Sequence, residues 1–181
     1  MELVTVVAIV GVLAALGTNG VRKYIAAAKA TEARNALGQM AKDASSAYDR
    51  GLTTGEVLGI GESAVSVARI CPTAAWPIPG ESDAIRGRKY QSGPDEWNDG
   101  AGWSCLKFAM KDPQYFQYYF AATPDVGGWE HGDQFDAIAR GDLNGDGVLS
   151  RFDLFGQIQQ AEDAGPVLTL APNIKETNPE E

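Results

Sequence analysis

The chain has 181 residues, which leaves room for one N-terminal helix and one globular domain of ordinary size. Its formal net charge is −9, and the acidic residues are concentrated after Arg50, whereas cations outnumber acids before it. This acidity disfavours nucleic acid and anionic membranes as partners of the C-terminal region.

The first stretch is apolar: no charged residue lies between Leu3 and Val21, and Glu2 stands alone just before it. A helix rises about 1.5 Å per residue, so this run reaches roughly 28 Å, close to the hydrocarbon thickness of a bilayer. A signal peptide would have a shorter apolar core and a small-residue cleavage site. We therefore predict that this segment spans a membrane. Its simplest role is that of a plain single-span anchor, and this alternative stays open.

Three features of this N-terminus resemble type IV pilins and, as near relatives, the pseudopilins of type II secretion. They are Glu2-Leu3, the apolar run from Val6 to Ala15 with its early Gly11, and Tyr24. The resemblance covers about 25 residues closely and extends through a helical continuation to about residue 50. It implies an α+β pilin fold, in which a long N-terminal helix packs against a small antiparallel sheet.

The resemblance also implies a function. The chain would be a non-enzymatic structural subunit of a pilus that supports adhesion or motility, and it would form a helical homo-oligomer. It would lie in the inner membrane before assembly and in a surface filament of a Gram-negative-type bacterium afterwards, with the pilus assembly machinery as a partner. Glu2 would pair with the terminal amine of a neighbouring subunit, and Gly11, Gly17 and Gly20 would belong to the assembling helix. Alternatives are a pseudopilin and a membrane-tethered, calcium-dependent adhesion module.

The predicted domains follow in chain order. Residues 1–23 form the apolar helix, although Gly17-Thr18-Asn19-Gly20 contains poor helix formers and is expected to interrupt or kink it. Residues 24–50 form an amphipathic helix that enters the head, and Gly51 is expected to cap it. The side chains of Arg22 and Lys23 are expected to lie on a solvated face of the helix. A globular head follows over 51–165, with weak helical signal around 62–68, and an acidic, proline-containing tail over 166–181 is expected to cover the surface or be disordered.

Cys71 and Cys105 are the two cysteines, and an exported chain favours a disulfide between them. The Pro- and Gly-rich stretch between them predicts a long loop. Its tryptophans, Trp76, Trp97 and Trp103, are expected to pin this loop to the core, and adhesive surface aromatics are the alternative.

Alternating and aromatic segments predict an antiparallel meander laid across the amphipathic helix. The candidate strands are 103–110, 115–121, 135–140 and 149–158.

The segment from Asp142 to Asp153 has the spacing of a calcium loop and looks like the loops of EF-hand and dockerin modules. Its candidate ligands are Asp142, Asn144, Asp146, Val148, Ser150 and Asp153. The same Asn-Gly-Asp-Gly residues form hairpin turns without metal, so calcium and a bare turn both stay open.

Catalysis has little support in the sequence. The single histidine, His131, lies in a turn-like segment beside an acid, and no nucleophile motif, phosphate loop or dinucleotide fingerprint is present. We therefore expect a protein that is not an enzyme.

Overall fold

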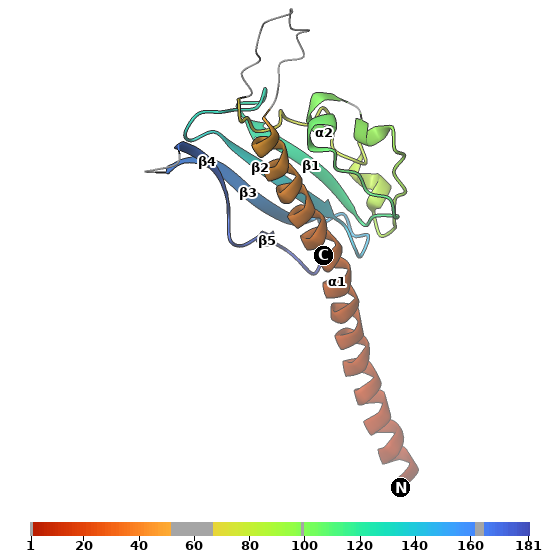
Figure 1. Cartoon of the computed structure of the whole chain (residues 1–181). Coiled ribbons are helices and arrows are strands. Elements are labelled where there is room, and N and C mark those ends of the chain that lie inside the picture. The colour runs from red at the N-terminus through yellow and green to blue at the C-terminus, as the bar shows by residue number, and fades with distance from the viewer. Residues whose placement is uncertain (1, 52–66, 99, 162–164) are drawn as a thin grey trace, which may run out of the picture.

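A computed structural model describes residues 2–51, 67–98, 100–161 and 165–181, without the side chains of Glu2 and Asn19. It has a single long helix at the N-terminus and an antiparallel sheet packed on the C-terminal half of that helix (Figure 1). The expected α+β class, a long helix on a small antiparallel sheet, is confirmed. The weak signal around 62–68 lies mostly outside the described residues.

Helix α1 (Glu2–Arg50) is continuous through Gly17 and Gly20, so the expected interruption is wrong for this structure. Each glycine weakens a helix by about 1 kcal/mol relative to alanine, which a helix of 49 residues can absorb. The helix ends as predicted at Gly51, which has φ 66° and donates its N–H to the carbonyl of Tyr48 at 3.1 Å.

Four strands pair antiparallel in chain order: β1 (Phe116–Thr123), β2 (Gln134–Gly141), β3 (Ser150–Ala161) and β4 (Gly165–Leu170). The short β5 (Lys175–Thr177) pairs with the beginning of β3, on the same edge as β4. The tail thus adds two mostly exposed strands to the edge of the sheet, so it lies at the surface as one alternative predicted, and the alternative of a disordered tail is wrong.

The core lies between one face of the sheet and the C-terminal half of α1. The helix contributes mostly small residues, and the strands contribute aromatic rings. Small helix side chains let the sheet approach closely, while the rings fill the space between. The main core residues are Ala30, Ala33, Leu37, Met40 and Ala44 from α1, and Phe116, Tyr118, Phe120, Phe135 and Phe152 from the strands.

The strand expected at 103–110 is wrong, because this segment begins with helix α2 (Gly100–Leu106). Trp103 and Leu106, three residues apart, are buried on one face of that helix. Gly102 lies against the chain at Ala74, where an added Cβ would be 2.6 Å from the Cα of Ala74. Only glycine permits this approach of α2 to the segment after Cys71.

The loop before α2 contains the 3₁₀ turns η1 (Ser82–Ile85) and η2 (Glu96–Asn98) and is pinned largely as predicted. Trp97 and Trp103 are buried edge to face, with ring centroids 5.1 Å apart. Each indole N–H is also satisfied, Trp97 by Ser92 Oγ and Trp103 by the carbonyl of Trp76. The side chain of Trp76 is 67 % exposed, so the prediction is wrong for this residue.

Candidate assembly helix and the Asp142 loop

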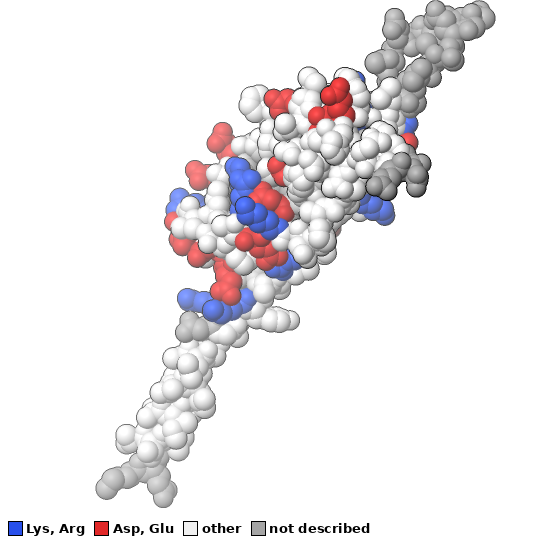
Figure 2. Space-filling view, turned by 90° about the vertical axis from the view of Figure 1, so that its left-hand side faces the viewer, with Lys and Arg blue, Asp and Glu red and all other residues white. Residues whose placement is uncertain are grey.

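The N-terminal part of α1 projects from the head as a bare apolar rod, which we call the stem (residues 3–21; Figure 1). Its described side chains are exposed along its whole length, and its most apolar 18-residue window has a mean hydropathy of 2.0. In Figure 2 it is the white extension that carries no charge. Among the described residues, α1 is the helix long and apolar enough to cross a membrane.

The predicted assembly residues lie along this stem. Cβ atoms added at Gly11, Gly17 or Gly20 would meet nothing within 4 Å, so packing inside the chain does not require these glycines. Glu2 begins the helix, and its side chain lies outside the described part.

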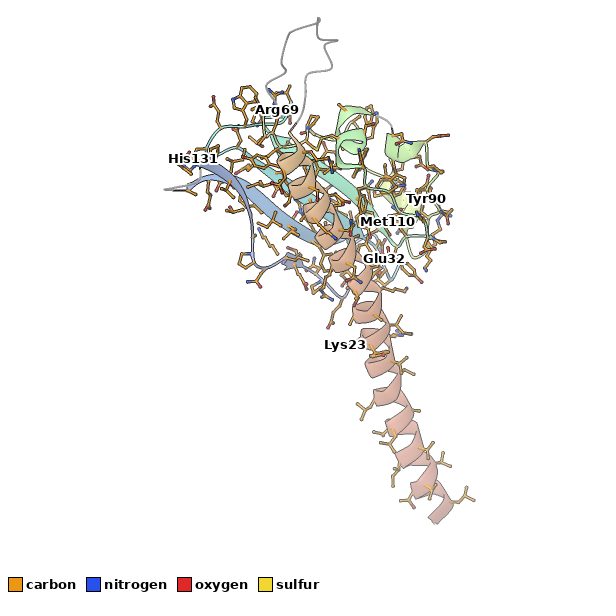
Figure 3. All side chains as sticks on the ribbon, in the orientation of Figure 1. Lys23, Glu32, Arg69, Tyr90, Met110 and His131 are labelled. Atoms are coloured by element: carbon orange, nitrogen blue, oxygen red, sulfur yellow. A yellow bond between two sulfur atoms is a disulfide. The ribbon has the colours of Figure 1, made fainter. Side chains whose placement is uncertain are left out.

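Glu32 fastens the helix to the first strand of the sheet, a role that the sequence analysis missed. Its Oε1 accepts hydrogen bonds from the amide of Tyr115 at 2.8 Å and from the hydroxyl of Tyr118 at 3.3 Å (Glu32 is labelled in Figure 3). Burial raises the pKa of Glu32, and these hydrogen bonds and the charge of Lys89 oppose that rise. Burial and the nearby Glu32 carboxylate raise the pKa of Tyr118 well above its usual value.

A second fastening joins the helix to the tail. Arg34 donates two hydrogen bonds to Glu176, from Nε at 2.7 Å and from a terminal nitrogen at 2.9 Å, and its guanidinium lies 5.6 Å from the ring centre of Phe152. The hydrogen bond from Arg34 lowers the pKa of Glu176. Such bidentate pairs fix orientation as well as adding energy.

The expected disulfide between Cys71 and Cys105 is present, with a Cα–Cα distance of 5.7 Å. It joins the chain before the loop to helix α2, next to the buried Trp103. It therefore closes the long loop onto the core.

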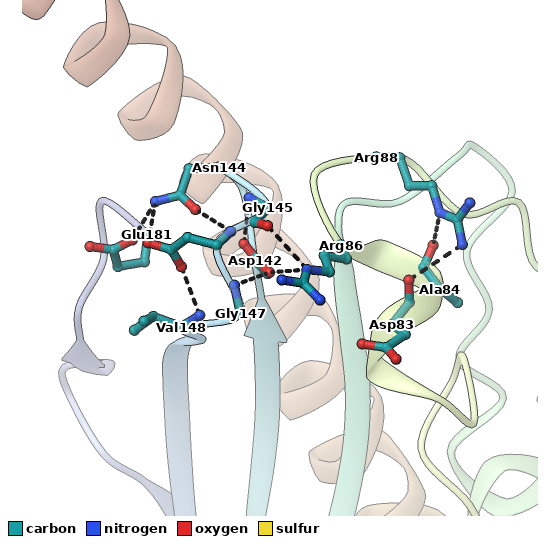
Figure 4. A network of polar contacts seen from close by, with 11 residues as sticks. Asp83, Ala84, Arg86, Arg88, Asp142, Asn144, Gly145, Gly147, Val148 and Glu181 are labelled. Atoms are coloured by element: carbon teal, nitrogen blue, oxygen red, sulfur yellow. Dashed lines mark hydrogen bonds and ion pairs between the residues drawn. The ribbon is translucent and has the colours of Figure 1, made fainter.

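The loop between β2 and β3 gathers Asp142, Asn144, Asp146 and Val148 into one tight turn (Figure 4). Asp142 is buried, and its two carboxylate oxygens accept the amides of Gly145 at 2.6 Å and Gly147 at 2.9 Å. Asn144 and Asp146 each accept the amide two residues further on. These local side-chain turns hold the loop in shape with protein groups alone.

The other two candidate calcium ligands point to different partners. The hydroxyl of Ser150 is buried and donates to the carbonyl of Gly141 at 2.9 Å. Asp153 lies on β3 and accepts hydrogen bonds from the guanidinium of Arg151 at 2.8 and 2.9 Å. Burial and the charge of Asp153 raise the pKa of the neighbouring Asp136.

The structure thus brings four of the six candidate ligands together. Among the described residues, no three Asp, Glu, His or Cys side chains converge in an arrangement that could hold a metal. His131 lies in an exposed loop between β1 and β2 (Figure 3).

No family model matches the chain, and no curated protein or solved structure is significantly similar to it.

Proposed function

We propose that the chain is a structural subunit of a type IV pilus-like filament, in which the stem spans the inner membrane before assembly and forms the filament core afterwards. The observation that carries the proposal is the division of one helix into two surfaces. The C-terminal half buries its small apolar face against the sheet, whereas the stem leaves its apolar side chains uncovered. A surface of this kind needs either lipid or other copies of itself.

Once the stem has left the membrane, the energetics favour stem bundling over exposure to water. Burial of apolar surface contributes about 25 cal/mol per Å² relative to water, so a whole stem amounts to tens of kcal/mol gross, before ordering offsets much of it. A Cβ added at Gly11, Gly17 or Gly20 would meet no other part of the chain, and these positions suit this role because small residues allow helices to approach closely.

The disulfide supports an exported head, since such bonds persist mainly in oxidising compartments. If the head is exported, the stem would act as an anchor, with its N-terminal end on the other side of the membrane.

Glu2 would set the axial register by pairing with the terminal amine of a neighbouring subunit. A carboxylate in an apolar bundle is costly without a cation, so we expect Glu2→Ala and Glu2→Gln to slow filament formation and relax its register. The head should remain equally stable, because Glu2 lies at the far end of α1. Filaments of normal rate and geometry from both variants would overturn this role.

Electron microscopy of material sheared from cells tests the proposal directly. Thin fibres built mainly of this chain are expected. A tethered adhesion module would instead stay in the envelope fraction as a monomer, which would overturn the proposal.

Calcium binding by the Asp142 loop stays a prediction. The loop offers oxygen atoms from Asp142, Asn144, Asp146 and the Val148 carbonyl, and calcium prefers such ligands. Asp153 would have to leave Arg151 to join them. Calcium titration of the intact chain, with Asp146→Asn as the comparison, measures whether it binds.

A further inference from the structure

The apolar stem ends against a set of cations at the base of the head. Arg22 and Lys23 follow Val21 directly, and Lys29 lies two turns further along α1. These three side chains line a groove of about 550 Å³ between α1, the loop after β2 and the tail. Figure 2 shows cationic side chains where the stem meets the head, and Figure 3 labels Lys23 at that level.

Three cations line this groove, and two carboxylates of the tail lie beside it: Glu180 pairs with Lys23, and Glu181 accepts a hydrogen bond from Asn144. Lys23 lies 3.3 Å from Glu180, but both side chains are well exposed, so this ion pair is weak. Among the described residues, neither Arg22 nor Lys29 has a carboxylate within 4.0 Å. The ammonium of Lys29 lies 4.6 Å from the ring centre of Tyr115, and that of Lys89 lies 4.7 Å from the same centre. Cations therefore gather here although the whole chain carries −9.

The position along the helix fits the surface of a bilayer. If the stem fills the hydrocarbon layer, then Arg22 and Lys23 lie at its boundary, and Lys29 lies about 12 Å beyond Val21 along the helix axis. Long cationic side chains reach from there toward headgroups. Tyr24, which is 77 % exposed, lies at the same level, and tyrosine is enriched at membrane interfaces.

We infer that the groove of Arg22, Lys23 and Lys29 binds the phosphate headgroups of anionic phospholipids while the stem spans the membrane. This inference rests on the membrane stage of the proposed function. The occupant follows from charge complementarity and from continuity with the apolar stem, since these place the groove at headgroup depth. The acidic remainder of the head would be held away from the same surface by repulsion.

The test uses the full chain in vesicles of phosphatidylcholine with a minor share of phosphatidylglycerol. Spin-labelled forms of the two lipids report which one is retained next to the protein. We expect a preference for phosphatidylglycerol of at least about fivefold, the effect of one cation near a charged bilayer surface. The triple variant Arg22→Gln, Lys23→Gln, Lys29→Gln should reduce it toward onefold, and added salt should weaken it.

The matched control is Lys42→Gln, Lys107→Gln, Lys111→Gln, which removes the same charge from exposed positions of the head outside the groove. It should keep the preference of the unmodified chain. Equal loss in both triple variants would show a net-charge effect and overturn the inference. Near-ultraviolet circular dichroism of each variant reports whether the head is folded.

Two further outcomes separate the inference from the proposed function. A chain that inserts into both kinds of vesicle but shows no lipid preference overturns the headgroup site alone, whereas a chain that inserts into neither overturns the membrane stage. If the groove variant keeps its lipid preference but loses filament yield, then the groove contacts a neighbouring subunit and not lipid. Binding of inorganic phosphate in detergent, without a lipid preference in vesicles, also overturns the headgroup site.

Discussion

The partly buried carboxylate of Glu32 joins helix α1 to the beginning of β1, and burial makes its charged form less favourable. Its Oε1 accepts from both Tyr115 and Tyr118, yet burial raises its pKa. The folded chain therefore binds the Glu32 proton more tightly than the unfolded chain does. Stability falls as the pH rises from the unfolded glutamate pKa through the raised folded value, and it is then constant.

We expect Glu32→Gln to remove this fall, because the amide oxygen can still accept both hydrogen bonds without a charge. The variant should match or exceed the unmodified chain in free energy of unfolding at pH 7, and the gain should shrink at low pH. Glu32→Ala should instead lose about 1–3 kcal/mol, since it leaves the buried Tyr118 hydroxyl without this acceptor. Denaturant unfolding at several pH values from 4 to 8 measures both, and a pH-independent difference for the Gln variant would contradict the argument.

At the scale of elements, the disulfide holds helix α2 and the loop before it. Cys71 and Cys105 are 34 residues apart, and a loop of that length is stabilised by roughly 3–4 kcal/mol in the chain-entropy model. The double variant Cys71→Ser, Cys105→Ser should lose about that much free energy of unfolding, measured with denaturant. Reduction of the unmodified chain is the control and should give a similar loss. A difference below about 1 kcal/mol would show that the buried tryptophans alone hold the loop.

The tail is held to the helix by the pair of Arg34 and Glu176. Because Arg34 lowers the pKa of Glu176, this contribution is present above the ordinary glutamate pKa and is lost as the pH falls through the lowered value. Glu176→Gln should speed amide exchange in β5 at neutral pH and leave β1 and β2 unchanged. Glu180→Gln is the matched control, since its pair with Lys23 is more exposed. Unchanged exchange in β5 would show that its backbone pairing with β3 is sufficient.

The sequence allowed three of the strands to be predicted, because aromatic and alternating residues mark segments with one buried face. Predicted strands at 115–121, 135–140 and 149–158 correspond to β1, β2 and β3. The tail strands were missed because their own residues are mostly exposed. They form on the open edge that the long β3 offers, which is a tertiary effect.

Local alternation was misleading at 103–110. There the disulfide, the close approach at Gly102 and the burial of Trp103 with Leu106 favour a short helix. The Asp142 loop was recognisable because its turn residues interact with amides within five positions. The pairs of Glu32 with Tyr118 and of Arg34 with Glu176 were not, since each joins residues that only the folded chain brings together.

For the whole molecule, the central question is whether the stem and the half of α1 that packs on the sheet act independently of each other. Val10 lies in the middle of the stem and is 58 % exposed, so a change there touches no part of the head. A charged residue at the centre of a membrane helix costs about 2.5–3.5 kcal/mol on insertion scales. Val10→Asp should therefore reduce membrane residence and abolish filament formation, while the free energy of unfolding of the head stays the same.

The matched control makes the same substitution in the head. It uses Val126, which lies in the loop after β1 and is 69 % exposed. Val126→Asp should leave both membrane residence and assembly intact. Membrane fractionation and electron microscopy of the two variants, side by side, measure the difference. If Val10→Asp assembled normally, the stem would not form the apolar core of a filament, and the uncovered surface of α1 would need another partner. If both variants failed alike, the loop after β1 would itself belong to the subunit interface, and assembly would depend on contacts between heads as well as between stems.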